Sequence, residues 1–190
     1  LNVLWADAPG TILPDTTYYA EDNEKGKELL ATWRQMQEEL LAKFDFSVEE
    51  IKDLLDKTIE LDAKLAKYVL SREESSEYVK LYHPYDWADF TKLAPNLPLD
   101  SIFTQILGEI PDKVIVPEER FWKEFAAEYY SEENWELLKA DLIVSAATSY
   151  NSYLTDEIRV LSGTYSRALS GTPQAMDKKK AAYYLASGAY

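Results

Sequence analysis

The sequence predicts an all-α protein, mainly helical with at most one very short strand, and three observations support this fold class. Glycine and proline are both absent from residues 27–82 and again from residues 118–162, and such stretches are typical of helices. Apolar residues recur there at intervals of three and four, as on one face of an amphipathic helix. Only residues 114–116 place three β-branched residues in a row. We therefore expect a single helical domain over residues 1–190, with about eight to nine helices.

The first two helices are expected to be long. The apolar face of the first is formed by Leu29, Leu30, Trp33, Met36, Leu40, Leu41 and Phe44. Asp45 and Phe46 then make a short turn, and Ser47 with Glu50 forms a capping box, in which each side chain satisfies a free backbone N–H at the helix start. A second apolar series runs from Val48 to Val69. Two long helices joined by so tight a turn are expected to pack antiparallel.

Beyond this pair the helices are expected to be shorter. Ser71 with Glu74 repeats the capping box at the start of a third helix. Five of the eight prolines fall between His83 and Pro117, which keeps helices there short. Further helices are predicted at residues 87–93, 99–107, 121–129 and 154–169. Another is expected to be capped by Ser131 and to carry Trp135 and Ile143, and the last is expected to begin at Thr172 and Pro173. Residues 114–116 are predicted to be extended, and to form a strand only if they find a partner.

The composition excludes several kinds of partner and site. Lysine and arginine number 20 against 34 acidic residues, for a net charge of -14, which repels phosphates and argues against nucleic acid or an anionic membrane surface. No apolar run approaches the roughly 18 residues that a membrane span needs. The absence of cysteine excludes disulfides and thiolate ligands. The chain begins at Leu1 rather than Met, and we interpret it as a fragment of a longer chain.

Candidate catalytic residues are few. His83 is the only histidine, so a His-Glu-x-x-His zinc motif cannot be present, and its aromatic and proline neighbours indicate a packed or turn histidine. Serine-nucleophile and glycine-rich phosphate motifs are also absent. On the second helix the acidic residues lie opposite the apolar series and alternate with lysines, as on a solvated face; they are Glu49, Asp53, Asp56 and Glu60. We therefore assign no catalytic residue, metal ligand or cofactor to this chain, and substrate-binding residues stay unknown.

The carboxyl-terminal quarter differs from the rest in charge and in tyrosine content. Residues 142–190 carry five basic and three acidic side chains, a net +2, whereas residues 1–141 carry 15 and 31, a net -16. This quarter either has less charged polar faces or docks on an acidic neighbour, and the candidate interdomain contacts are Arg159, Arg167, Lys178, Lys179 and Lys180. Tyrosine is common where two surfaces meet, and the set that predicts an interface is Tyr150, Tyr153, Tyr165, Tyr183, Tyr184 and Tyr190. The five tryptophans are dispersed, and we expect them to pack in the core.

Several segments together resemble the amino-terminal region of the neprilysin-type metalloendopeptidases, whose bacterial members include oligoendopeptidase O. Leu13-Pro14-Asp15 followed by Tyr18-Tyr19 resembles the LP…YY entry of that family into its first long helix. Ile59-Glu60-Leu61 with Leu65-Ala66 resembles a second helical motif. Three further segments follow in the same order as in that family. They are His83-Pro84 with Trp87, residues 114–116 leading to Phe121, and a segment that runs from Leu154 through Tyr165, Leu169 and Gly171 to the basic residues before Tyr184.

The resemblance implies a helical domain that folds over a thermolysin-like zinc domain and encloses a chamber admitting peptides but not folded proteins. Zinc and its ligands would then belong to the parent chain, and the partners would be the parent's own catalytic domain and peptide substrates. Secreted animal members place a cysteine near Ala181, so its absence points to a bacterial, cytoplasmic relative, with a secreted or surface-associated one as the alternative. Lys179 and Lys180 stand where the family tends to have arginines, which keeps the charge but loses the planar guanidinium.

Two main hypotheses about function follow. In the first, the chain is the non-catalytic helical part of a zinc metalloendopeptidase that hydrolyses oligopeptides, and it is inactive by itself. In the second, it is a free-standing acidic helical module whose tyrosine-rich end binds a protein. A carboxylate-based hydrolase is a third and weaker hypothesis. A His-Glu-x-x-His motif encoded beyond Tyr190 would favour the first over the second.

Overall fold

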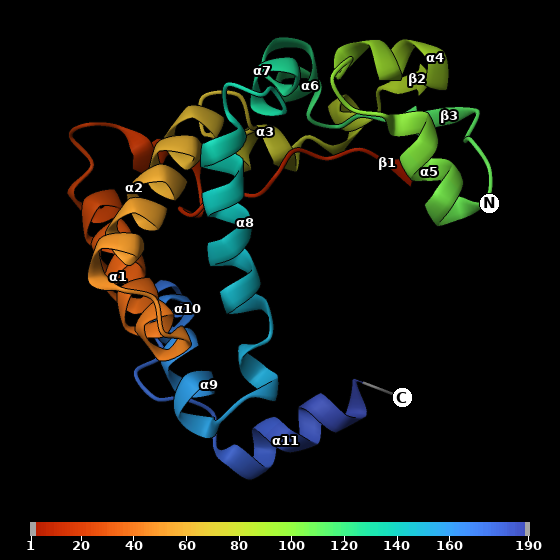
Figure 1. Cartoon of the computed structure of the whole chain (residues 1–190). Coiled ribbons are helices and arrows are strands. Elements are labelled where there is room, and N and C mark those ends of the chain that lie inside the picture. Colours follow the sequence, from red (N-terminus) through yellow and green to blue (C-terminus); the bar gives the residue numbers. More distant parts are fainter. Residues whose placement is uncertain (1–2, 189–190) are drawn as a thin grey trace. The chain divides into compact units, whose positions relative to one another are not determined.

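The computed structural model describes residues 3–188, and by its contacts the chain divides into two compact units. The first unit comprises residues 1–20 and 60–138, and the second comprises residues 21–59 and 139–190. Helices form most of both units (Figure 1), so the predicted mainly helical fold class is confirmed. The assignment of all 190 residues to one domain stays a prediction. None of the described helices combines the length and the apolar character that a membrane crossing requires.

The first unit is built from short helices and a small sheet. Its helices are α3 (Arg72–Ser76), α4 (Trp87–Phe90), α5 (Leu99–Leu107), α6 (Glu119–Glu124) and α7 (Ala126–Tyr129), with 3-10 turns at Thr16–Tyr19, Tyr78–Leu81 and Thr91–Leu93. The second unit contains α1 (Glu24–Leu41), α9 (Asp156–Ser162), α10 (Thr164–Ser170) and α11 (Lys178–Ser187), with 3-10 turns at Ala42–Phe44 and Asn151–Tyr153. Two longer helices, α2 (Val48–Leu65) and α8 (Trp135–Ser149), contribute residues to both units.

The sheet corrects the prediction of at most one strand. Three strands are present in the described chain, β1 (Leu4–Trp5), β2 (Pro84–Asp86) and β3 (Lys113–Ile115), in the order β1-β3-β2. The β-branched segment 114–116 contributes the central strand, which pairs parallel with β1 and antiparallel with β2. The partner strands are only two or three residues long and lie far away in sequence, so neither shows the local alternation by which a strand is predicted.

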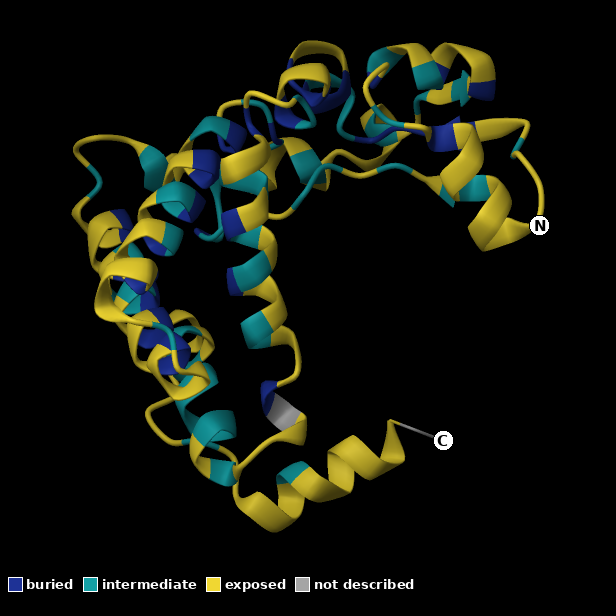
Figure 2. Ribbon diagram, in the orientation of Figure 1, coloured by how far each residue is buried: buried dark blue, intermediate teal, exposed yellow. Residues whose placement is uncertain are grey.

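The core of the first unit is aromatic. Phe121 of α6 is fully buried, and its ring meets those of Trp122, Phe125 and Tyr129 edge-on at centroid distances of 5.4, 6.3 and 5.5 Å. Tyr68, just beyond α2, stacks on Phe125 at 4.5 Å. Each such pair stabilises the fold by about 0.5–1.5 kcal/mol beyond the burial of its area. Figure 2 shows buried residues on α6 and α7 and on the adjoining strands.

The predicted antiparallel helix pair is confirmed within the second unit. Asp45 reverses the chain with a φ of 62°, a left-handed conformation that aspartate tolerates better than most residues. The predicted capping box is present, because the Glu50 N–H donates to the Ser47 Oγ at 3.3 Å and the Ser47 N–H donates to the Glu50 carboxylate at 2.8 Å. Arg34 of α1 and Asp56 of α2 lie equally far from Asp45 in sequence and form an ion pair of 2.7 Å. An antiparallel alignment produces this equal spacing.

Two of the predicted helices are each divided in the structure. The helix expected over residues 121–129 breaks at Phe125, whose φ of -133° is not helical, and gives α6 and α7. The helix expected over residues 154–169 breaks at Gly163 and gives α9 and α10. These breaks help to raise the number of α-helices in the described chain to 11, against the eight or nine predicted.

The last helix begins later than predicted. Pro173 was expected near its first residue, but α11 begins at Lys178. The side chain of Asp177 accepts hydrogen bonds from the N–H groups of Lys179 and Lys180, at 3.0 and 3.2 Å. Aspartate is among the strongest amino-terminal caps, and this cap, rather than the proline, marks the start of the helix.

Two tryptophans are not in the core. Trp33, Trp87 and Trp122 are buried as expected, whereas Trp5 and Trp135 are 55% and 54% exposed. Side chains alternate along a strand, and Leu4 is the β1 residue that packs on the core, so Trp5 faces the other way. Trp135 is the first residue of α8, a helix whose apolar residues do not gather on one face. Periodicity is a poor guide to burial in such a helix.

Candidate functional site

The only histidine is packed against the backbone. The Nδ1 atom of His83 lies 3.2 Å from the carbonyl oxygen of Val116, and its Nε2 atom lies 3.9 Å from the carboxylate of Glu119. Within residues 3–188, no three histidine, cysteine or acidic side chains come together as metal ligands would. Zinc sites in proteins use three or four such ligands. The described residues therefore do not fit a zinc ion.

The acidic residues of α2 form a solvated face, as predicted. Asp53 pairs with Lys57 at 2.7 Å, and Asp56 pairs with Lys52 at 2.7 Å. Hydrogen bonds from Lys52, and then from Arg34, hold the pKa of Asp56 below its ordinary value. Exposed pairs one helical turn apart stabilise a helix by about 0.3–0.5 kcal/mol each. A carboxylate kept ionised in solvent is poorly suited to act as a general acid.

A buried carboxylate joins the two sequence motifs that carry the resemblance. Asp62 of α2 is only 7% exposed. One of its oxygens accepts a hydrogen bond from the Ile12 N–H at 2.8 Å, and the other accepts one from the Tyr19 hydroxyl at 2.6 Å. The same hydroxyl accepts a hydrogen bond from the Leu13 N–H at 3.0 Å. We call Ile12, Leu13, Tyr19 and Asp62 the Asp62 clasp.

The clasp has a structural role. Burial, together with the negative charge of Asp62, raises the pKa of Tyr19 far above its ordinary value of 10, so the hydroxyl keeps its proton and donates a hydrogen bond to the carboxylate. A hydrogen bond to a charged group contributes about 1.5–3 kcal/mol. The clasp thereby fixes the loop that leads into the first long helix onto the end of α2.

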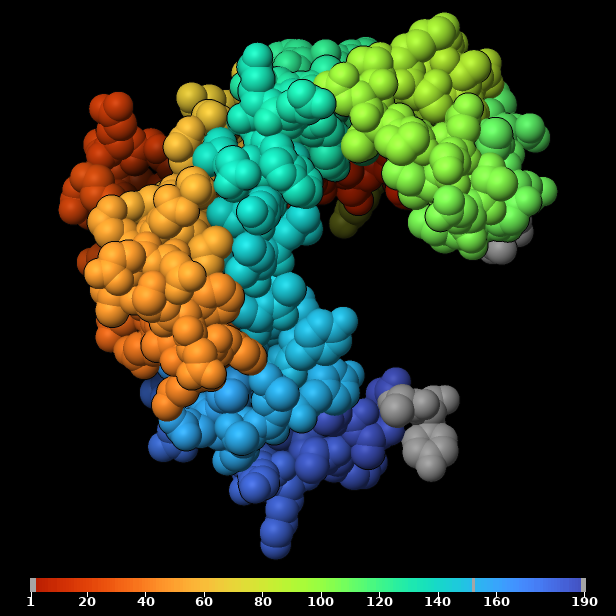
Figure 3. Space-filling model, viewed as in Figure 1, coloured from red at the N-terminus to blue at the C-terminus, as the bar shows by residue number. Residues whose placement is uncertain are grey.

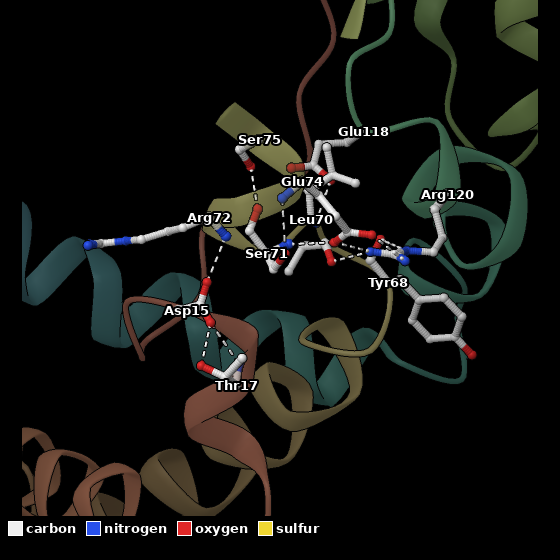
Figure 4. A network of polar contacts seen from close by, with 11 residues as sticks. Asp15, Thr17, Tyr68, Leu70, Ser71, Arg72, Glu74, Ser75, Glu118 and Arg120 are labelled. Atoms are coloured by element: carbon white, nitrogen blue, oxygen red, sulfur yellow. Dashed lines mark hydrogen bonds and ion pairs between the residues drawn. The ribbon is translucent and has the colours of Figure 1, made fainter. Parts of the chain in front are cut away.

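A second polar network begins at Asp15, in the same loop (Figure 4). One oxygen of Asp15 accepts a hydrogen bond from the Arg72 N–H at 2.7 Å, and the other accepts one from the Thr17 N–H at 2.9 Å. These bonds lower the pKa of Asp15, the bond from Arg72 most of all. Ser71 and Glu74 complete the predicted capping box of α3. The loop is therefore held to the start of α3 as well as to the end of α2.

Arg120 of α6 extends this network. Its guanidinium donates to the carbonyl oxygens of Tyr68 and Val69 at 3.3 and 2.7 Å, and to both carboxylate oxygens of Glu74. The two carbonyls lie just past the end of α2, where the helix can no longer satisfy them. Figure 4 shows the arginine reaching across to the segment between α2 and α3. One side chain thus joins three elements.

Glu118 lies beside this network and is half-buried. Its carboxylate accepts a hydrogen bond from the Leu70 N–H at 2.9 Å. Burial nevertheless raises the pKa of Glu118 above its ordinary value of 4.5, and the carboxylate of Asp7 acts in the same direction. A half-buried acid with a raised pKa is a common catalytic feature, but here its hydrogen bond is to a structural backbone group.

The predicted interdomain residues lie in different environments within the second unit. Arg159 is paired with Asp156 at 2.8 Å and donates to the carbonyl oxygen of Met176 at 3.0 Å. Arg167 donates to the carbonyl oxygen of Val160 at 2.8 Å. The three lysines, in contrast, are exposed on α11: Lys178, Lys179 and Lys180. The structure brings Arg159 and Lys178 to one groove of about 440 Å³, lined also by Leu154 and Leu185.

Most of the predicted tyrosine set is exposed. Tyr150, Tyr153, Tyr183 and Tyr184 are all exposed, and the Lys180 ammonium lies 5.9 Å from the centre of the Tyr184 ring. Tyr165 is half-buried, and its N–H donates to the sulfur of Met36. Tyr190 lies outside the described residues. No residue of α11 is buried, and the space-filling view shows this helix (blue) with its side chains standing free on the visible face (Figure 3).

Comparison with known proteins identifies the family. The model of peptidase family M13 matches residues 1–190. The chain belongs to peptidase family M13. The match is to the amino-terminal part of these zinc metallopeptidases, so the resemblance to the neprilysin-type family is confirmed.

Relatives in the M13 family are much longer than this chain. A Streptococcus gordonii protein named as a zinc metalloproteinase is 67% identical over 190 residues, which are 100% of this chain and 34% of that protein. The neutral endopeptidase of Lactococcus lactis subsp. cremoris is 37% identical over 172 residues, 90% of this chain and 27% of that protein. The chain thus spans between about a quarter and a third of the length of these relatives.

Solved structures support the fold. The crystal structure of PepO from Lactobacillus rhamnosis HN001 matches 96% of this chain and 29% of its own, with a TM-score of 0.88 and 26% identity. The open state of the zinc metalloprotease Zmp1 of Mycobacterium tuberculosis matches 92% of this chain and 27% of its own, with a TM-score of 0.74 and 20% identity. The second comparison shows the likeness of the fold alone.

Sequence reasoning missed the residues that hold these M13 motifs together. Asp62 is a buried polar residue within the apolar series of α2, and a polar residue among the core positions of an amphipathic helix is a signal of a buried partner. Glu118 and Arg120 directly follow the proline that ends the extended segment 114–116. Nothing in the local sequence pairs them with residues 68–74.

Proposed function

We propose that this chain is the non-catalytic helical part of a bacterial zinc metalloendopeptidase, in which it encloses the substrate chamber and restricts cleavage to oligopeptides. The observation that carries this proposal is the match of peptidase family M13 to all 190 residues of a chain that spans only about a third of its S. gordonii relative. Most of such a protein lies outside this chain, and that part is long enough to contain the catalytic domain.

The chemistry of the described residues supports a catalytic site in another part of the parent chain. Zinc hydrolases hold the metal with a set of close histidine and carboxylate ligands, and this sequence has one histidine. That histidine and the buried acids described above are hydrogen-bonded to backbone groups or to tyrosine. We therefore place zinc and its ligands in the parent chain, and we propose the parent's catalytic domain and peptide substrates as the partners. The absence of cysteine is consistent with a cytoplasmic site of action, with secretion or surface attachment as the alternative.

The exposed lysines of α11 would contribute to docking on the rest of the parent. Lys178, Lys179 and Lys180 stand beside exposed tyrosines in the part of the chain whose net charge is +2. We propose that they face an acidic surface of the catalytic domain, with Arg159 and Arg167 holding the local structure behind them. Reversing the three lysines to glutamate should lower the melting temperature of the full-length protein more at low salt than at high salt. Reversal of Lys67 and Lys139, exposed lysines for which the described chain shows no ion pair, serves as the control.

Parallel assays of the full-length protein and of residues 1–190 test the proposed function. Zinc content is measured by mass spectrometry, and hydrolysis is followed with a fluorogenic oligopeptide and with a folded protein that carries the same cleavage sequence in a loop. We expect the full-length protein to hold zinc and to cleave the peptide far faster than the folded protein. Residues 1–190 should do neither.

Two results would contradict the proposal in different ways. Zinc at one equivalent and peptide hydrolysis by residues 1–190 alone would place the catalytic site in this chain. Equal cleavage of the peptide and the folded protein by the full-length enzyme would refute the chamber. A protein that ends at Tyr190 in the cell would instead favour the alternative, a free-standing acidic helical module that binds a protein through its exposed tyrosines.

A further inference from the structure

The outer edge of β1 has free backbone groups. The Ala6 N–H donates to the Ile115 carbonyl of β3 at 2.8 Å, and Trp5 lies level with Ile115 in the parallel register. Backbone groups of successive residues point to opposite edges of a strand. The N–H and C=O of Trp5 therefore point away from β3, toward the edge where the described chain provides no further strand. An open edge of this kind is a template for pairing with another strand.

The face of the sheet beside this edge is apolar and partly exposed. Leu4, Tyr85 and Val114 pack on the core from one face. Trp5, Ile115 and Pro84 are level with one another in the register and lie on the other face. A groove of about 770 Å³ opens beside this edge. Its apolar lining residues are Val3, Leu4, Tyr82, Pro84, Leu107, Pro111 and Ile115, and its charged ones are Glu109, Asp112 and Lys113. Parallel strand pairs are normally covered on both faces; on this face Ile115 is buried, but Trp5 and Pro84 beside it are exposed.

Helix α5 extends the same apolar surface. Ile106 and Leu107 are 69% and 51% exposed, and Ile102, one turn before Ile106, is exposed as well. Gly108 ends the helix with a φ of 81° and leads to Ile110, which is also exposed. Figure 2 shows α5 mostly exposed beside the strands, and in Figure 3 no other segment lies over its visible face. The sheet edge, the groove and α5 all belong to the first unit.

We propose that an extended segment of the same polypeptide, outside residues 1–190, pairs with β1 as a fourth strand and places apolar side chains at alternate positions into this groove. An extended segment is required because any cover that excludes water must also bond the free N–H and C=O of Trp5, and a helix has no free backbone groups along its length. The same polypeptide supplies it because the S. gordonii relative is about three times as long as this chain. A tethered segment also has a high effective concentration.

This inference rests on one part of the proposed function, that the chain belongs to a longer peptidase, and not on the chamber. The test uses the full-length protein with the photo-crosslinker benzoylphenylalanine in place of Trp5 or, separately, of Ile106. A mixture of isotopically light and heavy protein distinguishes cross-links within a chain from those between copies. We expect both positions to cross-link within the chain to a segment outside residues 1–190. The control position is Lys92, an exposed residue of the same unit.

Hydrogen exchange of the unmodified full-length protein provides a second measurement that no substitution can disturb. The Trp5 amide should exchange at least ~100-fold more slowly than an unpaired amide, as paired backbone groups do. Any one of four results would overturn the proposal. The Trp5 amide could exchange at the rate of an unpaired amide, or the cross-links could form only between copies or only to an added substrate peptide. Cross-linking at Trp5 and Ile106 could also be no greater than at Lys92. Peptide hydrolysis by the same preparation is scored separately, so that loss of the proposed function and loss of the fourth strand can be told apart.

Discussion

Removing one hydroxyl from the Asp62 clasp should destabilise the first unit measurably. In Tyr19→Phe, Asp62 loses the donor that lies 2.6 Å from its carboxylate, and the Leu13 N–H loses the acceptor at 3.0 Å. Both groups stay in a buried region, since Leu13 is 2% and Asp62 is 7% exposed. A hydrogen bond to a charged group contributes about 1.5–3 kcal/mol and an unsatisfied buried donor costs about 1–3 kcal/mol. Because Asp62 keeps its bond from Ile12, we expect a total loss of about 2–4 kcal/mol.

Urea unfolding followed by tryptophan fluorescence measures this loss, because Trp87 and Trp122 are buried in the first unit. With a denaturant slope of about 2 kcal/mol per M, the midpoint should fall by about 1–2 M. Tyr18→Phe is the matched control, since the Tyr18 hydroxyl has no hydrogen-bond partner within the described chain. Equal midpoints for the two variants would refute the assignment of a stabilising role to the clasp.

Three further substitutions test other parts of the structure. Burial raises the pKa of Glu118, so at pH values above 4.5 the folded chain holds a proton that the unfolded chain has released, and stability falls as the pH rises through that window. Urea titrations between pH 4 and 7 should show a steeper fall in the parent than in Glu118→Gln, where Asp141, whose pKa burial also raises, still contributes. Arg120→Lys keeps the charge but loses the forked contacts to two carbonyls and Glu74, and should lower the free energy of unfolding by about 1–2 kcal/mol. Asp177→Ala removes the cap of α11 and should cost that helix about 1 kcal/mol, seen as faster hydrogen exchange of its first turn.

Local signals predicted the elements that local interactions determine. The helix at residues 99–107 has the predicted bounds because Pro98 precedes it and Gly108, with a φ of 81°, ends it. The capping boxes at Ser47 and Ser71 are present for the same reason, since each box is complete within four residues. The prediction that Thr172 and Pro173 begin the last helix was wrong, because the cap formed by Asp177 starts it instead.

Long-range pairing could not be predicted in this way. The sheet depends on Leu4 meeting Val114, and neither strand partner of β3 has a pattern of its own. The two networks of the candidate site likewise join residues far apart in sequence, Tyr19 with Asp62 and Arg120 with Glu74. Their polar groups were visible in the sequence, but their partners were determined by tertiary packing. The basic residues of the carboxyl-terminal quarter stay a prediction, because their partner would lie in another part of the protein.

The motifs that carry the family resemblance contribute residues to the Asp62 clasp, which explains them by the fold rather than by activity. Leu13 and Tyr19 of the first motif and Asp62, which directly follows the Ile59-Glu60-Leu61 motif, meet in one clasp. A motif that fixes a loop to a helix identifies the fold of this part of an M13 protein, and we predict that it supplies no group for peptide hydrolysis. In the full-length protein we therefore expect Tyr19→Phe to lower the melting temperature while leaving kcat/KM per folded molecule unchanged at a temperature where the variant is folded. A lower kcat/KM under those conditions would mean that the clasp acts on the substrate and not only on the fold.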